Sequence, residues 1–93
     1  MLHTELIQSF PSNSQKRVRI EIGVVEDLVT RKPTETFNLT LDVNQYVAFV
    51  EEKIDMMNHI PTVKIIYPFG SPLIIEGEKT VMSEKNYIEI EFL

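Results

Sequence analysis

Residues 36–61, TFNLTLDVNQYVAFVEEKIDMMNHIP, contain the change of hydrophobic period that decides the fold. In the first part of this stretch every second residue is apolar: Phe37, Leu39, Leu41 and Val43. Further on, apolar residues recur at spacings of three and four: Val47, Val50, Ile54 and Met57. Alternation is typical of a half-buried strand and the wider spacing of an amphipathic helix, so a strand is expected to lead directly into a helix.

The ends of this helix are marked by polar residues and a proline. Asp42 or Asn44 can accept hydrogen bonds from the free N–H groups of the first turn, and Asn44 is the preferred N-cap. The helix is expected to end within residues 58–61, because the residue before Pro61 avoids the helical region.

Upstream, a second alternating segment predicts a partner strand, with apolar residues Val18, Ile20, Ile22 and Val24. Strands this close in sequence pair as an antiparallel hairpin. Pro33 cannot donate to a central ladder, so residues 31–34 predict a turn, within a connecting loop over residues 26–34.

Downstream of Pro61 the chain returns to strands. The apolar positions that predict them are Val63, Ile65 and Tyr67, then residues 73–75, then Ile88, Ile90 and Phe92. Residues 68–72, PFGSP, predict a turn, and residues 76–86 a connection. One helix across a mixed sheet of four to five strands would bury the apolar side of every strand, which predicts the α+β class.

The charges suit an arrangement with the first and last strands side by side in the middle of the sheet. Arg17, Arg19 and Glu21 would then lie beside Glu89 and Glu91 on the outward face, where opposite charges attract mildly. The basic residues around the first hairpin are expected to balance the acidic last strand: Lys16, Arg17, Arg19, Arg31 and Lys32.

Residues 1–15 are expected to form an N-terminal leader, and residues 16–93 a single domain. Leu2, Leu6 and Ile7 fit one stripe of a short helical turn, followed by a polar cluster at residues 11–15. The leader is either a frayed terminus or a segment that folds back over the domain or reaches a partner.

Composition excludes several classes of protein. The 93 residues include no cysteine, which excludes disulfides, thiolate metal sites and cysteine nucleophiles. The net charge of -5 argues against a nucleic-acid partner. No apolar run approaches the roughly 20 residues of a membrane span, and residues 1–10 lack a signal-peptide pattern. An intracellular, cytoplasmic protein without a membrane partner is therefore expected.

Catalytic constellations are nearly absent from the sequence. His3 and His59 stand apart from any carboxylate at metal-ligand spacing, and the three glycines form no phosphate-binding loop. We therefore predict no enzyme activity, no cofactor and no metal.

The ordered pattern resembles ubiquitin and the ubiquitin-like β-grasp domains. The similarity is densest at residues 40–43 (TLDV), 50–54 (VEEKI) and 60–61 (IP), and residues 64–73 look like the third strand, glycine turn and fourth strand. It covers residues 17–93 and implies a β-grasp fold. Conjugated members end in a Gly-Gly tail, whereas this sequence ends in Phe92-Leu93, so the resemblance implies a non-conjugating member.

Ubiquitin-like domains usually present one face of the sheet to protein partners. The family's main contact, an isoleucine on the third strand, corresponds to Ile66, with Lys64, Glu89 and Glu91 as expected neighbours on that face. The resemblance therefore implies a partner-binding patch here, more acidic than that of ubiquitin. The alternative is that Ile66 is a lone exposed apolar residue.

Two further features are candidate contacts. Tyr46, Phe49 and Met56 widen the apolar arc of the helix, and either complete a broad core-facing arc or form a partner or dimer contact. Phe69, in the turn at residues 68–72, either anchors in a partner's pocket or folds onto the sheet edge.

Together these features predict a protein–protein interaction module, a small ubiquitin-like adaptor or subunit of a larger complex. One alternative is an accessory or regulatory subunit of a bacterial enzyme or secretion system, similar in size to the small subunits of multicomponent monooxygenases and the small ubiquitin-like protein of type VII secretion. Another is a homo-oligomeric structural protein.

Overall fold

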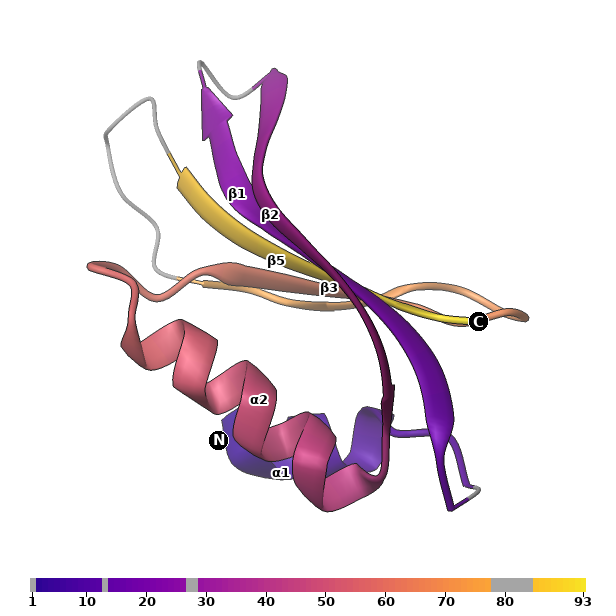
Figure 1. The fold of residues 1–93 in the computed structure, drawn as a ribbon. Coiled ribbons are helices and arrows are strands. Elements are labelled where there is room, and N and C mark those ends of the chain that lie inside the picture. The colour runs from indigo at the N-terminus through magenta and orange to yellow at the C-terminus, as the bar shows by residue number, and fades with distance from the viewer. Residues whose placement is uncertain (1, 13, 27–28, 78–84) are drawn as a thin grey trace.

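A computed structural model describes residues 2–12, 14–26, 29–77 and 85–93. Its elements, in chain order, are α1 (Leu2–Ser9), β1 (Lys16–Glu26), β2 (Thr30–Leu41), α2 (Val43–Asp55), β3 (Thr62–Ile66), β4 (Leu73–Ile75) and β5 (Lys85–Phe92). The strands form a five-stranded mixed sheet in the order β2-β1-β5-β3-β4. Both helices lie on one side of this sheet (Figure 1), which confirms the α+β class. Within the described ranges no helix covers the other side, the open face of the sheet.

The first and last strands form the middle of the sheet, as predicted. β1 pairs antiparallel with both β2 and β5, whereas β5 runs parallel to β3. In the β1–β5 ladder Arg19 lies opposite Glu91, and Glu21 opposite Glu89. The expected proximity of the outward charges is thus confirmed for Arg19 and Glu21. Arg17 lies outside the β1–β5 ladder, and Glu21 faces a like charge rather than an opposite one.

The first hairpin extends further than predicted. Glu26 already pairs with Thr30, and β2 runs through residues 31–34, where a turn was expected. Pro33 is tolerated because β2 is an edge strand and because the register shifts between Ile22 and Gly23, a β-bulge that places Pro33 opposite the glycine. The predicted turn at residues 31–34 is therefore wrong.

The start of α2 also differs from the prediction. Asp42, not Asn44, is the N-cap: the Gln45 N–H donates to Asp42 Oδ1 at 2.8 Å, and the Asp42 N–H donates to Gln45 Oε1 at 3.1 Å. This reciprocal pair is a capping box, which satisfies two free donors at once. At the other end the helix stops at Asp55, before the predicted residues 58–61.

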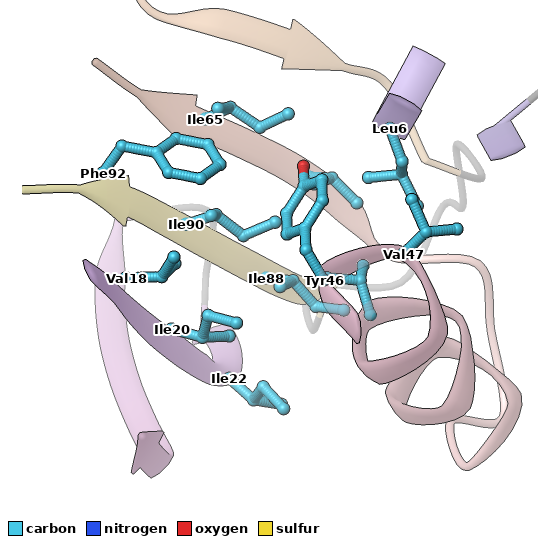
Figure 2. Packing of buried hydrophobic residues seen from close by; sticks show 12 residues of the cluster. Leu6, Val18, Ile20, Ile22, Tyr46, Val47, Ile65, Ile88, Ile90 and Phe92 are labelled. Carbon is cyan, nitrogen blue, oxygen red and sulfur yellow. The ribbon is translucent and has the colours of Figure 1, made fainter. Parts of the chain in front are cut away.

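The core lies between the helices and the sheet (Figure 2). Its buried members are Leu6, Val18, Ile20, Ile22, Tyr46, Val47, Val50, Val63, Ile65, Ile88, Ile90 and Phe92. The predicted inward-facing apolar residues of β1, β3 and β5 are thus confirmed, except Val24, which is half-buried and lies outside this cluster. On α2, Val47 and Val50 are buried, whereas Ile54 and Met57 pack against the cluster in partly buried positions.

The N-terminal segment folds back over the domain. Leu6 of α1 is fully buried beside α2 (Figure 2), and the ring of Phe10 meets that of Phe92 edge to face, with centroids 5.6 Å apart. Ser9 Oγ donates to the Leu6 carbonyl, so the Tyr46 hydroxyl donates to Ser9 Oγ at 2.7 Å. α1 therefore shares the core of residues 16–93, and the frayed alternative is wrong.

Candidate functional site

The open face of the sheet carries the patch predicted around Ile66. The parallel register of β3 and β5 sets Lys64 beside Glu89 and Ile66 beside Glu91, so the four residues are neighbours. Lys64 Nζ lies 4.0 Å from Glu89 Oε1. Their exposure is uneven, because Ile66 and Glu91 are half-buried and Glu89 is only 7% exposed.

An ion-pair network covers the half of the open face formed by β1, β2 and β5. Its centre is a pair of buried carboxylates, Glu21 and Glu89, which lie opposite each other on β1 and β5. Arg31 of β2 donates to both carboxylates, reaching Glu89 Oε1 at 3.2 Å. Arg19 donates to Glu21 Oε1 at 2.9 Å. The expected balance between basic hairpin and acidic last strand is thus confirmed for Arg31.

Tyr87 and Gly23 complete this network. The Tyr87 hydroxyl donates to Glu21 Oε2 at 2.9 Å, and the Arg31 guanidinium lies 4.8 Å from the centroid of the tyrosine ring. Tyr87 faces Gly23 across the β1–β5 ladder. A Cβ at position 23 would lie 2.7 Å from the Tyr87 hydroxyl oxygen and 2.4 Å from the Lys32 carbonyl oxygen. Glycine is therefore needed for the tyrosine to cross β1 and reach Glu21.

The pKa shifts of Glu21, Arg31 and Tyr87 reflect their burial and the hydrogen bonds among them. Burial is the largest influence on the pKa of Glu21 and raises it, but hydrogen bonds from Tyr87, Arg19 and Arg31 hold this pKa below its ordinary value of 4.5. The hydrogen bond to Glu89 is the main reason that the pKa of Arg31 is raised, and burial raises the pKa of Tyr87. Tyr87 is therefore a protonated donor at neutral pH, and Glu21 is a charged acceptor.

A shallow hollow of about 500 Å³ adjoins the network on the open face. Its lining residues are Val25, Arg31, Thr62, Lys64, Lys85, Asn86, Tyr87 and Glu89. The carboxylate and the phenol in this lining already have partners within the network, so they offer no free base or nucleophile. Two lysines, Lys64 and Lys85, also line this hollow.

The β3–β4 hairpin exposes two apolar side chains, one on the open face and one in the turn between the strands. Phe69, in the turn, is 91% exposed, and Ile74 on β4 is 57% exposed. Lys64 lies opposite Ile74 in the β3–β4 ladder, so Ile74 shares the outward face with Ile66 on β3. The exposure of Phe69 contradicts the alternative in which this ring folds onto the sheet edge. Ile74 had not been singled out, because three consecutive apolar residues do not reveal which one faces outward.

The helix candidates do not form one contact surface. Tyr46 is fully buried, so its predicted role as a contact is wrong. Its ring lies in the core between α2 and the sheet (Figure 2), and its hydroxyl donates a hydrogen bond to Ser9. Phe49 is half-buried and packs edge to face on Phe37, with centroids 5.1 Å apart. Met56, which is 70% exposed at the end of α2, is the candidate that remains available.

Across the described ranges, no cluster of three histidine or acidic side chains is arranged to hold a metal ion. Neither helix of the described chain has the length and apolar character needed to cross a bilayer. Comparison of the chain with family models, curated protein sequences and solved structures found no match.

Proposed function

We propose that this chain is a non-catalytic protein–protein interaction module, an adaptor or small subunit that binds a protein partner through the β3–β4 end of its open face. The observation that carries the proposal is the joint exposure of Phe69 and Ile74 on one hairpin. Exposed apolar surface marks interaction sites, and full burial of a large apolar side chain contributes roughly 1.5–3 kcal/mol.

The surroundings of these two residues fit the usual anatomy of an interface. Lys64 lies opposite Ile74, and Glu91 lies beside the half-buried Ile66, so charges of both signs border the apolar centre. Protein interfaces commonly combine an apolar centre with a polar rim. A partner with one or two apolar anchors and flanking charges of both signs suits this surface.

The non-catalytic part of the proposal is supported by the state of the titratable groups. Glu21 and Glu89 are both bound by Arg31, and the hydroxyl of Tyr87 is bound to Glu21. Catalytic acids and bases need an accessible group with a pKa near the working pH. The lowered pKa of Glu21 and the raised pKa of Tyr87 move both groups away from that range.

A likeness to ubiquitin-like β-grasp domains forms a second, structural part of the proposal. It is supported by a leading hairpin, a helix across one face and a last strand in the middle of the sheet. The sense of that strand differs: β5 runs antiparallel to β1, whereas the first and last strands of ubiquitin run parallel. The proposed likeness therefore extends to the order of the elements and the use of the open face, and not to strand sense.

Affinity capture from the native host tests the proposed contact. The wild-type chain, the double variant Phe69→Ser/Ile74→Ser and the single variant Val29→Ser serve as baits, followed by quantitative mass spectrometry. Val29 is a matched control because it is 85% exposed at the β1–β2 end. We expect one partner to be recovered by the wild type and by Val29→Ser, and to be lost with the double variant.

A further variant, Ile66→Ala, examines the middle of the open face, and its recovery of the partner should be reduced. Each bait is first checked for an unchanged thermal melting curve. Equal recovery of every protein by the wild type and the double variant would overturn the proposed surface.

A further inference from the structure

The outer edge of β2 has two halves that differ in protection against pairing with another strand. The first half carries Arg31, Lys32 and Glu35, together with Pro33 at the bulge. Charges, prolines and bulges are the usual devices that keep an edge strand from pairing. The second half, residues 36–41 (TFNLTL), carries no charge and no proline. It therefore lacks these devices while facing outward at the end of the sheet.

The opposite edge of the sheet differs in length. β4 has three residues and follows directly after Pro72, so it offers little backbone for a further strand. β2 has 12 residues. Within the described part of the chain, residues 36–41 are thus the longest unprotected edge segment.

We propose that residues 36–41 of two copies of this chain pair antiparallel, edge to edge, in a symmetric dimer whose two-fold axis passes between the two Asn38 residues. In this register Asn38 faces Asn38, Phe37 faces Leu39, and Thr36 faces Thr40. Directly opposite residues of an antiparallel pair lie on the same face of the sheet. The apolar residues of both copies therefore stay on the helix-covered side.

The charges of the chain agree with this register. No residue from Thr36 to Thr40 is charged, and Glu35 falls opposite Leu41, so the pairing brings no like charges together. Like charges directly opposite on neighbouring strands are unfavourable. Pairing with a second copy thus keeps the apolar residues on the helix-covered side and places no like charges opposite each other.

The same geometry closes the assembly at two copies. A two-fold contact uses the same edge on both partners, and the short β4 leaves no comparable edge for continued growth. β2 and β4 lie at opposite ends of the strand order, so a dimer would present two copies of the proposed β3–β4 contact at its far ends. The dimer is independent of the partner proposal, since it uses a different edge.

Light scattering coupled to size-exclusion chromatography tests the dimer on the full chain. We expect twice the 10.8 kDa mass of the chain at high concentration, falling toward the monomer on dilution. Asn38→Lys places two lysines face to face across the axis and should weaken the dimer at least about tenfold. Thr30→Lys adds the same charge to the same strand at an exposed position far from the pairing, and should dimerise like the wild type.

A charge-swap experiment distinguishes a dimer lost through charge repulsion from one lost because the variant is misfolded. Asn38→Asp alone should weaken the dimer in the same way, whereas an equimolar mixture of Asn38→Lys and Asn38→Asp should form a heterodimer. Amide hydrogen exchange gives a second measure, because protection of residues 36–41 in the wild type should rise with concentration. A wild type that stays monomeric up to about 1 mM, an open-ended series of larger assemblies, or a dimer unaffected by Asn38→Lys would overturn the proposal.

Discussion

The two halves of the open face of the sheet differ in which kind of side chain is buried and which is exposed. Over β1, β2 and β5, two glutamates are buried and Arg31 is bound to both. At the β3–β4 end, Phe69 and Ile74 are left in solvent. The comparison teaches that the charges over β1, β2 and β5 hold one another within the fold, whereas the apolar residues of the β3–β4 end stay exposed. We propose that these exposed residues bind a partner.

Arg31→Met should have the largest effect on stability. It leaves Glu21 and Glu89 buried without the cation they share, and breaking a buried ion pair costs about 3–5 kcal/mol. Because the Arg31 side chain is 42% exposed, solvent screening lowers the expected loss to about 2 kcal/mol. Urea denaturation measures the free energy of unfolding.

Lys32→Met is the matched control for this change. Lys32 is the next cation along β2, its side chain is 68% exposed, and its Nζ lies 3.6 Å from Glu26 Oε1. An exposed pair of this kind contributes less than about 1 kcal/mol. Equal losses of stability in the two variants would contradict a special role for the buried network.

Gly23→Ala should have the next largest effect. The added methyl group would meet the Lys32 carbonyl oxygen at 2.4 Å and displace the ring of Tyr87. Overpacking of this kind costs about 1–3 kcal/mol. The same denaturation experiment measures the loss, and near-ultraviolet circular dichroism should report the altered environment of the tyrosine. An unchanged free energy of unfolding would show that the close packing over Gly23 is not required.

The pH dependence of stability sharpens the comparison further. Because the pKa of Glu21 is lower in the folded chain than its ordinary value of 4.5, its ionisation stabilises the fold above that value, and the contribution is lost as the pH falls. Glu21→Gln should therefore lower stability at neutral pH and flatten the acid limb. The check is denaturation at several values between about pH 6 and about pH 3. An acid limb as steep in Glu21→Gln as in the wild type would exclude this residue as its cause.

Phe69→Ser should have the smallest effect on stability. A side chain that is 91% exposed makes few contacts with the rest of the chain, so the change in the free energy of unfolding should stay within about 0.5 kcal/mol. Thermal melting alongside the wild type measures it. A loss comparable to that of Arg31→Met would place Phe69 in the fold rather than in a partner contact.

The local patterns of the sequence predicted much of the architecture. The spacing of apolar residues shows which side of a strand or helix is buried, and it can be read from neighbouring residues alone. This applies to the alternation in residues 18–24 and 88–92 and to the wider spacing from Val47 onward. The patch of Lys64, Ile66, Glu89 and Glu91 came from a resemblance combined with alternation, and the register of β3 and β5 brings these residues together.

Two of the wrong predictions depended on distant parts of the chain, whereas the N-cap is set locally by the pairing of Asp42 with Gln45. Pro33 lies within a strand because β2 is at the edge of the sheet, which no local pattern reveals. Tyr46 is buried in the core, where its hydroxyl donates a hydrogen bond to Ser9, 37 residues earlier, and its ring packs against Phe10. The sequence around Gly23 did not predict that a side chain packs over this residue, because that side chain is Tyr87 on the last strand.

The affinity of the captured partner for single variants tests the central claim most directly. Isothermal titration calorimetry should give a dissociation constant for Phe69→Ser at least about tenfold higher than that of the wild type, because truncating a central interface anchor costs about 2 kcal/mol or more. Val29→Ser should bind like the wild type. Equal dissociation constants for all three proteins would contradict the assignment of the β3–β4 end as the partner contact.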